Sequence, residues 1–210
     1  MTVCFFGTYD RGHSANRLLA QAVEAAGARL EHLHVPLWEG EPNKDRRYFG
    51  ARSLGRLGRR YAAAVAALRR RWRARSGPPP VVLVGFGGQL DVLVAARVCR
   101  PRRGLVFAPL VSLTETLVED RRVFPSGGLR ARALAGLDRL TLRLPDLVLA
   151  DTEAHGRYLA GLGAEPGRVA TWYLGAEPEF LEPPEPQPTD DRVLFYGRFL
   201  PLHGLETIVA

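Results

Sequence analysis

The sequence predicts an α/β fold with a Rossmann-like, doubly wound parallel sheet. Two observations predict it: apolar runs of strand length alternate with segments of helical periodicity, and most of these runs are continuous. Helices cover both faces of a parallel sheet, so its strands consist of nearly uninterrupted apolar residues. A chain of 210 residues has room for one such domain and part of another.

The first half of the chain predicts two strands and two helices. The first helix has apolar residues at helical spacing between Ser14, its expected N-cap, and Gly27, its expected stop. The second has an apolar stripe flanked by arginines, and two early glycines place its firm start near Arg59. The strands are a short apolar run and an alternating run. In chain order we expect a strand at 3–7, a helix at 14–27, a strand at 29–35 and a helix at 54–72.

The second half predicts four more strands, separated by helices. The first is a β-branched run that three prolines precede. We expect strands at 81–84, 105–107, 147–150 and 168–172, and helices at 90–99, 129–144 and 152–162. These elements complete one doubly wound domain over residues 1–181.

A proline-rich linker is expected at 182–191, and a truncated second domain at 192–210. Residues 193–204 consist of an apolar run, a Gly-Arg turn and a helix start, which is typical of the beginning of a nucleotide-binding domain. One strand and half a helix cannot bury their apolar faces alone, so we expect 192–210 to fold poorly in the isolated chain.

Composition narrows the class of protein. No apolar run approaches the roughly 20 residues of a membrane span, and no basic segment precedes the first strand, so no signal peptide is expected. Cys4 and Cys99 lack the spacing of a zinc site or a disulfide framework, and we expect both to be small buried residues. These features favour a cytoplasmic protein without a metal.

Positive charge is concentrated in one segment. The net charge is +7, and residues 44–75 hold twelve basic residues against one acid, Asp45. Codon bias explains the choice of arginine over lysine, but it does not explain the clustering. A local basic patch predicts a local anionic partner, either membrane lipid or an anionic acceptor. The candidate contacts are Arg59, Arg60, Arg69, Arg70, Arg71 and Arg73.

Nucleic acid is not the expected partner of this patch. The basic segment lacks interleaved aromatic residues, and the rest of the chain is net acidic. An alternative is that the helix only covers the sheet, and the two readings are compatible if the apolar stripe faces inward and the arginines face outward.

Ligands of doubly wound sheets bind outside the carboxyl ends of the strands. The loops expected there lie at 7–13, 85–89, 109–128, 151–153 and 173–177. Their glycines permit close backbone approach, and their polar side chains can bind a ligand; plain turns and helix capping, notably by Thr152, are the alternatives. The candidate ligand contacts are Gly7, Thr8, Asp10, Arg17, Gly87, Gln89, Ser112, Thr114, Thr152 and Glu153, and the Arg17 guanidinium is expected to point back toward the first loop.

The long connection at 109–128 holds the candidate catalytic groups. Its hydroxyls and carboxylates suit sugar recognition or general-base chemistry, and Glu115 and Asp120 are the candidates. A solvated loop is the alternative for either carboxylate. His155 is expected to be a surface residue of its helix.

Four segments resemble the GT-B glycosyltransferases, specifically the family 4 group. They are Phe-Phe-Gly-Thr-Tyr-Asp at 5–10 with Asn16 and Arg17, the segment 109–121, Ala-Asp-Thr-Glu-Ala-His at 150–155, and the segment 196–204. The last is similar to the opening of that family's second domain, and the combination is more specific than any one motif.

The resemblance implies two Rossmann-like domains that face each other across a cleft, with the acceptor bound by the first and a nucleoside-diphosphate sugar by the second. Gly197, Arg198 and His203 would bind the donor diphosphate, with histidine where lysine is more usual. It implies metal-independent transfer of a hexosyl-type sugar, with retention, to a glycan or lipid-linked acceptor, and no cofactor beyond this co-substrate.

One feature of the family is missing. Its later glutamate pair, which binds the donor, lies beyond Ala210, so we expect this chain to be inactive by itself. A cytoplasmic enzyme with a peripheral contact to the inner face of the membrane is expected. The alternative is a non-catalytic Rossmann-like module that binds an anionic lipid or glycan.

Overall fold

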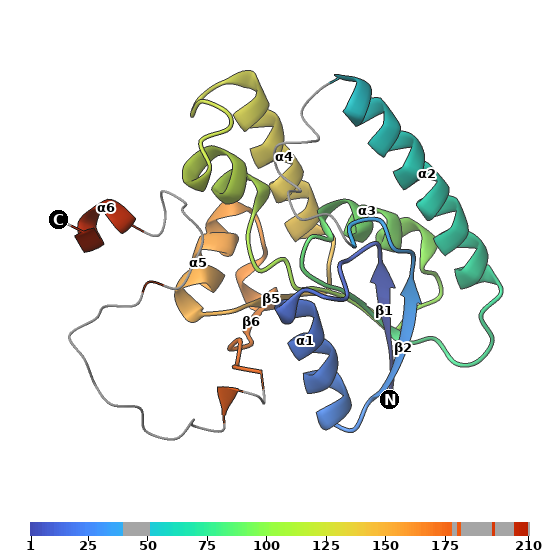
Figure 1. Ribbon diagram of the computed structural model, residues 1–210. Helices are drawn as coiled ribbons and strands as arrows, with labels where there is room; N and C mark the ends of the chain where they lie inside the picture. The colour runs from blue at the N-terminus through green and yellow to red at the C-terminus, as the bar shows by residue number, and fades with distance from the viewer. Residues whose placement is uncertain (40–50, 178–179, 182–194, 196–203, 210) are drawn as a thin grey trace.

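The computed structural model describes residues 1–39, 51–177, 180–181, 195 and 204–209, with the backbone alone at 51–54. Six parallel strands form one sheet in the order β2-β1-β3-β4-β5-β6 (Figure 1). The predicted α/β class and all six predicted strands are confirmed. The strands are β1 (Thr2–Gly7), β2 (Arg29–His34), β3 (Val81–Val84), β4 (Gly104–Phe107), β5 (Leu147–Ala150) and β6 (Val169–Thr171).

The predicted helices are present. They are α1 (Ser14–Ala25), α2 (Ala51–Arg73), α3 (Gln89–Val98), α4 (Leu129–Arg143) and α5 (Glu153–Leu162). Most of their boundaries differ from the predicted ones by a few residues, as expected for helix ends. The expected firm start near Arg59 was wrong, because α2 is already helical from Ala51 and continues through Gly55 and Gly58. A short helix, α6 (Leu205–Val209), follows Gly204.

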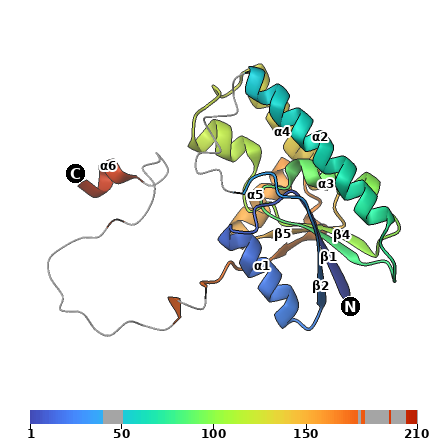
Figure 2. The ribbon, with the colours of Figure 1, turned by 45° about the vertical axis from the view of Figure 1, so that its right-hand side comes forward.

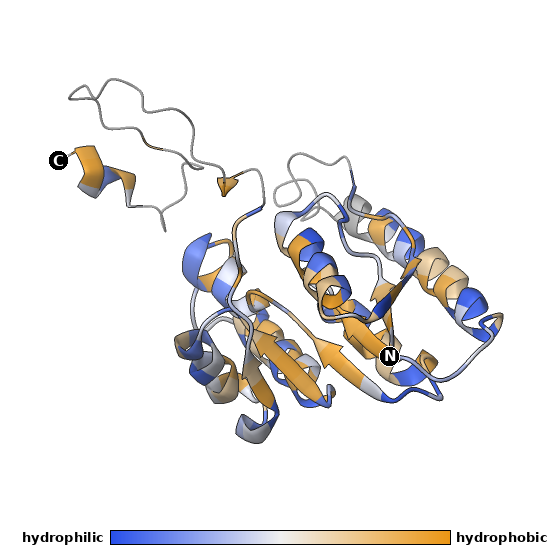
Figure 3. Ribbon diagram, turned by 90° about the horizontal axis from the view of Figure 1, so that it is seen from below, coloured by the Kyte–Doolittle hydropathy of each residue, from blue (hydrophilic) through white to orange (hydrophobic). Residues whose placement is uncertain are grey.

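Two hydrophobic clusters cover the two faces of the sheet. Alternate residues of β1 divide between them: Cys4 and Phe6 join one cluster, and Phe5 joins the other. The first cluster includes residues of α2, α3, α4 and α5, whereas the second is covered by α1 through Leu19. Figure 2 shows α1 on one side of the sheet and α2 and α3 on the other. The inner strands are strongly hydrophobic, as the orange colour of the sheet in Figure 3 shows, which agrees with a sheet covered on both faces, whereas the edge strand β2 mixes apolar with polar residues.

Two other local predictions were wrong. Ser14 does not cap α1; His13 does, because its extended backbone precedes the first helical residue and its Nδ1 accepts a hydrogen bond from the N–H of Ala15 at 3.3 Å. The connection 109–128 is not entirely a loop, because Glu115–Asp120 forms a π-helical segment. Gly27 does follow the end of α1 with a left-handed φ of +76°, as predicted for a stop signal.

Both cysteines are buried, as predicted. Burial raises the pKa of the Cys4 thiol to about 12, so this side chain stays protonated and packs as a small apolar group. The predicted linker at 182–191 and the predicted strand of the second domain, except Phe195, lie outside the described residues. No helix within the described ranges has the length and apolar character of a membrane span.

Candidate functional site

The strand order reverses at β1, whose neighbours are β2 on one side and β3 on the other. In open parallel sheets this reversal separates the loops at the carboxyl ends and leaves a crevice between them. Here the two loops are 8–13, after β1, and 85–88, after β3. The predicted candidates Gly7, Thr8, Asp10 and Gly87 therefore lie at the carboxyl ends of two adjacent strands.

Asn16 joins these two loops. Its side chain is 2% exposed. Its Nδ2 donates to the carbonyl of Asp10 at 3.0 Å, and its Oδ1 accepts from the N–H of Phe86 at 2.9 Å. A Cβ at Gly85 would lie 2.4 Å from Asn16 Oδ1, so only glycine permits this approach. The reversal point is thus closed by a fixed polar contact.

Asp91 holds the loop after β1 in place through its carboxylate. Its carboxylate is buried and accepts hydrogen bonds from the N–H of Thr8 at 2.6 Å and from the hydroxyl of Tyr61 at 3.0 Å. Burial raises the pKa of Asp91, although these hydrogen bonds oppose the shift. Thr8 is 1% exposed and also donates its hydroxyl to Asp91 at 3.0 Å. The N–H and the hydroxyl of Thr8 therefore form hydrogen bonds with Asp91 inside the protein.

The other candidates of these two loops differ in how accessible they are. Gly87 has a φ of +80°, and a Cβ there would meet nothing within 4 Å. Gln89 is buried, and its Nε2 donates to the carbonyl of Val111 at 3.1 Å. Asp10 accepts from the N–H of Gly12 at 2.9 Å. Of these three candidates, Gly87 is the exposed one, and its backbone is open to a ligand.

Arg17 points back toward the first loop, as predicted. Its Nη1 donates to the carbonyl of Gly12 at 2.9 Å, and its guanidinium forms an ion pair with Glu177. Glu177 belongs to the loop that follows β6, so this pair connects two of the loops in which ligand contacts were expected.

Glu115 and Ser112 are locked together at the carboxyl end of β4. Glu115 Oε2 accepts from the N–H of Ser112 at 3.3 Å, and Ser112 Oγ accepts from the N–H of Glu115 at 2.9 Å. The hydroxyl groups of Ser112 and Tyr158 lie 3.4 Å apart. A carboxylate and two hydroxyls thus converge: the loop supplies Glu115 and Ser112, as its composition predicted, and α5 supplies Tyr158, which sequence reasoning missed.

His155 is not the surface residue that its helical position suggested. Its side chain is 12% exposed, and its Nδ1 lies 2.7 Å from Oδ1 of Asp151. The second nitrogen, Nε2, is buried without a hydrogen-bond partner in the described structure and lies 3.8 Å from Oε2 of Glu115. His155 lies in the first turn of α5, and its imidazole turns back toward Asp151, which precedes the helix cap Thr152. The spacing of Asp151 and His155 was the signal in the sequence.

Burial raises the pKa of Glu115, and two neighbours oppose the shift, the N–H of Ser112 first and then His155. The Glu115 side chain is 30% exposed. It therefore combines partial access with a proton affinity above the ordinary one, which suits a group that binds or deprotonates a hydroxyl.

Asp138 fixes the loop that carries Glu115. This buried carboxylate of α4 accepts from the N–H groups of Leu113 at 2.9 Å and Thr114 at 2.8 Å, and from the Thr114 hydroxyl at 2.7 Å. The candidate Thr114 is therefore a structural contact. Sequence reasoning missed Asp138, although a carboxylate on the buried face of a helix was a visible signal.

The remaining candidates at this edge of the sheet are Asp120, Thr152 and Glu153. Asp120 ends the π-helical segment and is half-buried, and its charge raises the pKa of Glu115. Thr152 caps α5, since its Oγ1 accepts from the N–H of His155 at 3.1 Å, which confirms the capping alternative. Glu153 is exposed in the first turn of α5.

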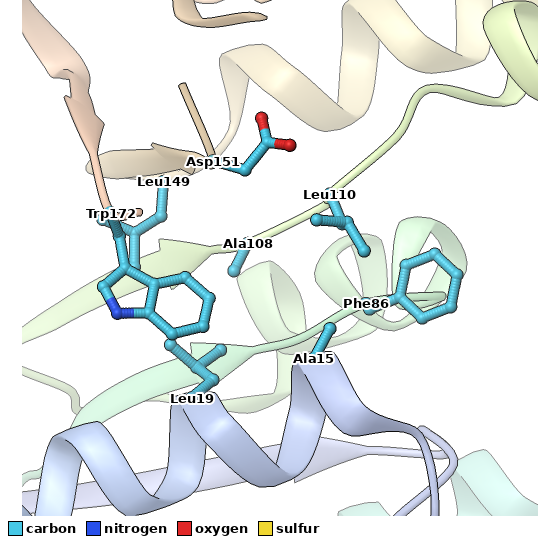
Figure 4. Close-up of a pocket in the computed structure, with 8 residues that line it drawn as sticks. All are labelled: Ala15, Leu19, Phe86, Ala108, Leu110, Leu149, Asp151 and Trp172. Carbon is cyan, nitrogen blue, oxygen red and sulfur yellow. The ribbon is translucent and has the colours of Figure 1, made fainter. Parts of the chain in front are cut away.

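A small apolar pocket separates the reversal point from the Glu115 cluster. Its volume is about 10 Å³, which is room for about one water molecule. Figure 4 shows the Trp172 indole above Leu19 of α1 and the Asp151 carboxylate turned away from it. The lining residues are Ala15, Leu19, Phe86, Ala108, Leu110, Leu149, Asp151 and Trp172. Asp151 thus borders both the pocket and the His155 cluster.

The arginines of α2 from Arg56 to Arg73 face outward, while its apolar stripe packs inward through Ala64, Leu68 and Trp72. Two of these arginines bind carbonyl groups: Arg71 that of His34 at 2.6 Å and Arg60 that of Leu37 at 3.4 Å. The helix therefore covers the sheet with its apolar stripe and also exposes a basic surface, so the two interpretations remain compatible. The other predicted contacts, Arg59, Arg69, Arg70 and Arg73, are exposed.

The predicted diphosphate contacts Gly197, Arg198 and His203 lie outside the described residues. Within the ranges that the structure describes, no group of three His, Cys, Asp or Glu side chains is arranged to hold a metal ion.

The comparisons with known proteins find structural similarity but no match by sequence. No protein-family model matches the chain, and no curated protein matches it. Among solved structures, the crystal structure of Anabaena Alr3699/HepE in complex with UDP and glucose is similar, with a TM-score of 0.46 and 15% sequence identity. The match covers 84% of this chain but only 45% of that one, so this chain spans less than half of its length.

Proposed function

We propose that the chain is the acceptor-side part of a glycosyltransferase that uses a nucleoside-diphosphate sugar. Two independent features support the proposal. The first is the resemblance of four sequence segments to the GT-B family 4 enzymes. The second is the arrangement of polar groups at the carboxyl ends of β4 and β5.

The observation that carries the proposal is the cluster around Glu115. A partly exposed carboxylate lies beside the hydroxyl groups of Ser112 and Tyr158, and His155 lies behind it. Carboxylates and hydroxyls in this arrangement bind ligands with several hydroxyl groups, such as a glycan or the sugar head of a lipid-linked acceptor. Glu115 is the group that we expect to contact the reacting acceptor hydroxyl.

The donor half of the reaction rests on residues after the linker. Arg198 and His203, with the backbone of Gly197, are proposed to bind the diphosphate, since guanidinium groups bind phosphate oxygens in pairs. Stabilisation of the leaving diphosphate by fixed cations fits metal-independent transfer, and retention of configuration is carried over from the resemblance alone. We propose that residues 1–210 by themselves lack measurable transfer activity.

The reading frame that includes residue 210, expressed to its end, tests the proposal. We expect micromolar affinity for at least one sugar nucleotide in a panel of UDP, GDP and ADP sugars, measured by calorimetry. Arg198→Ala should weaken that affinity by more than about tenfold, while Arg132→Ala, which removes an exposed arginine of α4, should leave it unchanged. A frame that stops after Ala210, or a full-length product without affinity for any sugar nucleotide, excludes the transferase.

The alternative is a non-catalytic module that binds an anionic lipid or glycan, and α2 favours contact with anionic lipid. This helix has no acidic residue, and its arginines from Arg56 to Arg73 face outward from a packed apolar stripe. A peripheral contact with the inner face of a membrane follows for a cytoplasmic protein. Sedimentation with anionic vesicles should be salt-sensitive and should be lost when Arg69, Arg70, Arg71 and Arg73 become alanine; binding that these changes leave intact contradicts the membrane contact.

A further inference from the structure

Two adjoining grooves lie at the amino edge of the sheet, opposite the Glu115 cluster. Their volumes are about 440 and 480 Å³, and they share Arg100 and Pro101 in their walls. The C-terminal ends of α2 and α3 and the starts of β3 and β4 border them. Their size is that of a site for a small ligand.

Arginines dominate the walls of these grooves, which we call the arginine groove. The lining arginines are Arg73, Arg75, Arg97, Arg100, Arg102 and Arg103. The lining contains a single acid, Asp146, and its Oδ2 accepts from the N–H of Leu105 at 2.8 Å. Among the described residues, only Arg75 of these six has a carboxylate within ion-pair distance, that of Glu31 at 3.0 Å. The groove therefore concentrates positive charge that the rest of the fold does not neutralise.

Contacts at the end of α3 hold two of the guanidinium groups in place. Arg100 Nε donates to the carbonyl of Ala96 at 3.3 Å, and Arg102 Nη1 donates to that of Cys99 at 3.2 Å. Cations at a helix C-terminus are favourable, so these two contacts have a structural explanation. That explanation leaves the Nε of Arg102 buried without a hydrogen-bond partner in the described structure.

Structural capping does not explain Arg73 and Arg103. Both are exposed, one in the wall of each groove. Neither side chain forms a hydrogen bond or ion pair with a described residue. Repulsion between like charges disfavours such clustering unless an anion binds between them.

We propose that the arginine groove binds an anion that carries several phosphate groups. Guanidinium groups bind phosphate oxygens in pairs, and two linked grooves with arginines in both can hold more than one phosphate. A nucleic acid is a poorer fit, because the only aromatic residue in the lining, Trp72, is buried and offers no stacking surface for bases. This site is separate from the proposed acceptor site, shares Arg73 with the basic surface of α2, and does not depend on the proposed function.

Tripolyphosphate is the probe for the test, with calorimetry on the 210-residue chain at about 0.15 M ionic strength. The test variant is Arg73→Gln with Arg103→Gln. The matched control is Arg132→Gln with Arg157→Gln, which removes the same charge from exposed positions on α4 and α5. We expect the affinity to fall roughly tenfold or more in the test variant and to stay unchanged in the control. All four side chains are exposed, and circular dichroism checks that both variants fold.

Vesicles of phosphatidylcholine with phosphatidic acid distinguish the two sources of phosphate. Sedimentation that the test variant abolishes, and that free tripolyphosphate inhibits, assigns the site to lipid headgroups. Tripolyphosphate binding without such sedimentation assigns it to a soluble phosphate compound. Absence of tripolyphosphate binding, or an equal loss of binding in the test and control variants, overturns the proposal.

Discussion

Nδ1 of His155 lies 2.7 Å from Oδ1 of Asp151. A carboxylate can only accept a hydrogen bond, so the imidazole donates from Nδ1. This contact turns Nε2 toward Glu115, at 3.8 Å. Asp151 therefore determines which nitrogen of the imidazole points toward Glu115, the carboxylate that we place next to the acceptor.

His155→Gln should raise the pKa of Glu115 further. Burial already raises this pKa above its ordinary value of 4.5, and His155 is one of the two groups that lower it. The folded protein thus binds the proton more tightly than the unfolded chain, so Glu115 contributes less to stability as the pH rises from 4.5 toward its folded pKa. In the variant this interval extends to higher pH. The carboxyl ¹³C shift of Glu115, followed against pH, measures this pKa in the wild type and in the variant. Arg157→Gln on the same helix is the control. Equal pKa values of Glu115 in the His155→Gln variant and the wild type would contradict the interaction.

Asp138→Asn should destabilise the protein by about 1–3 kcal/mol. The carboxylate accepts three hydrogen bonds from Leu113 and Thr114, and an amide offers one oxygen while its NH₂ group faces donors. Urea unfolding gives the free energy. Glu165→Gln, at an exposed ion pair with Arg168, should change it by less than about 0.5 kcal/mol. A similar loss in both variants would show that Asp138 has no special role.

The fold was predictable because its signals are local. Apolar runs identified most of the strands, among them the one at 81–84, and alternation identified the strand at 29–35. The carboxyl-end rule then placed Ser112 and Glu115 in the candidate site. These inferences need only sequence periodicity and the connectivity of parallel strands.

The contacts that shape the site were not predictable in the same way. Thr8 and Asp91 are 83 residues apart, and nothing local indicates that the second supports the first. The inward turn of His155 depends on how α5 packs, and a helix pattern alone left it at the surface. The buried carboxylates Asp91 and Asp138 were visible as acids in apolar surroundings, but their partners follow from tertiary structure.

Asp91→Asn should change how stability depends on pH. Burial raises the pKa of Asp91 above its ordinary value of 3.8, so the folded state takes up a proton that the unfolded chain has already released. The free energy of unfolding of the wild type therefore falls as the pH rises from 3.8 through the folded pKa. The variant cannot titrate at this position and should lack that decrease. Urea unfolding at several pH values from acid to neutral measures the difference, and parallel pH profiles of the two proteins would refute the assignment.

Gly85→Ala should destabilise the protein by about 1–3 kcal/mol, because it overpacks the crevice at the reversal point. The added methyl group would lie 2.4 Å from Asn16 Oδ1 and 2.6 Å from the Phe5 ring. The Asn16 side chain is buried and bonds both loops, so it cannot move without breaking the contact with Phe86. Gly58→Ala is the matched control: nothing lies within 4 Å of the new methyl group on the exposed side of α2, and helix propensity should stabilise that variant by about 0.5–1 kcal/mol. Urea unfolding compares the two, and NMR shifts of the Phe86 amide report whether the loops separate. An unchanged Phe86 amide in a stable Gly85→Ala protein would mean that Asn16 does not hold the crevice closed.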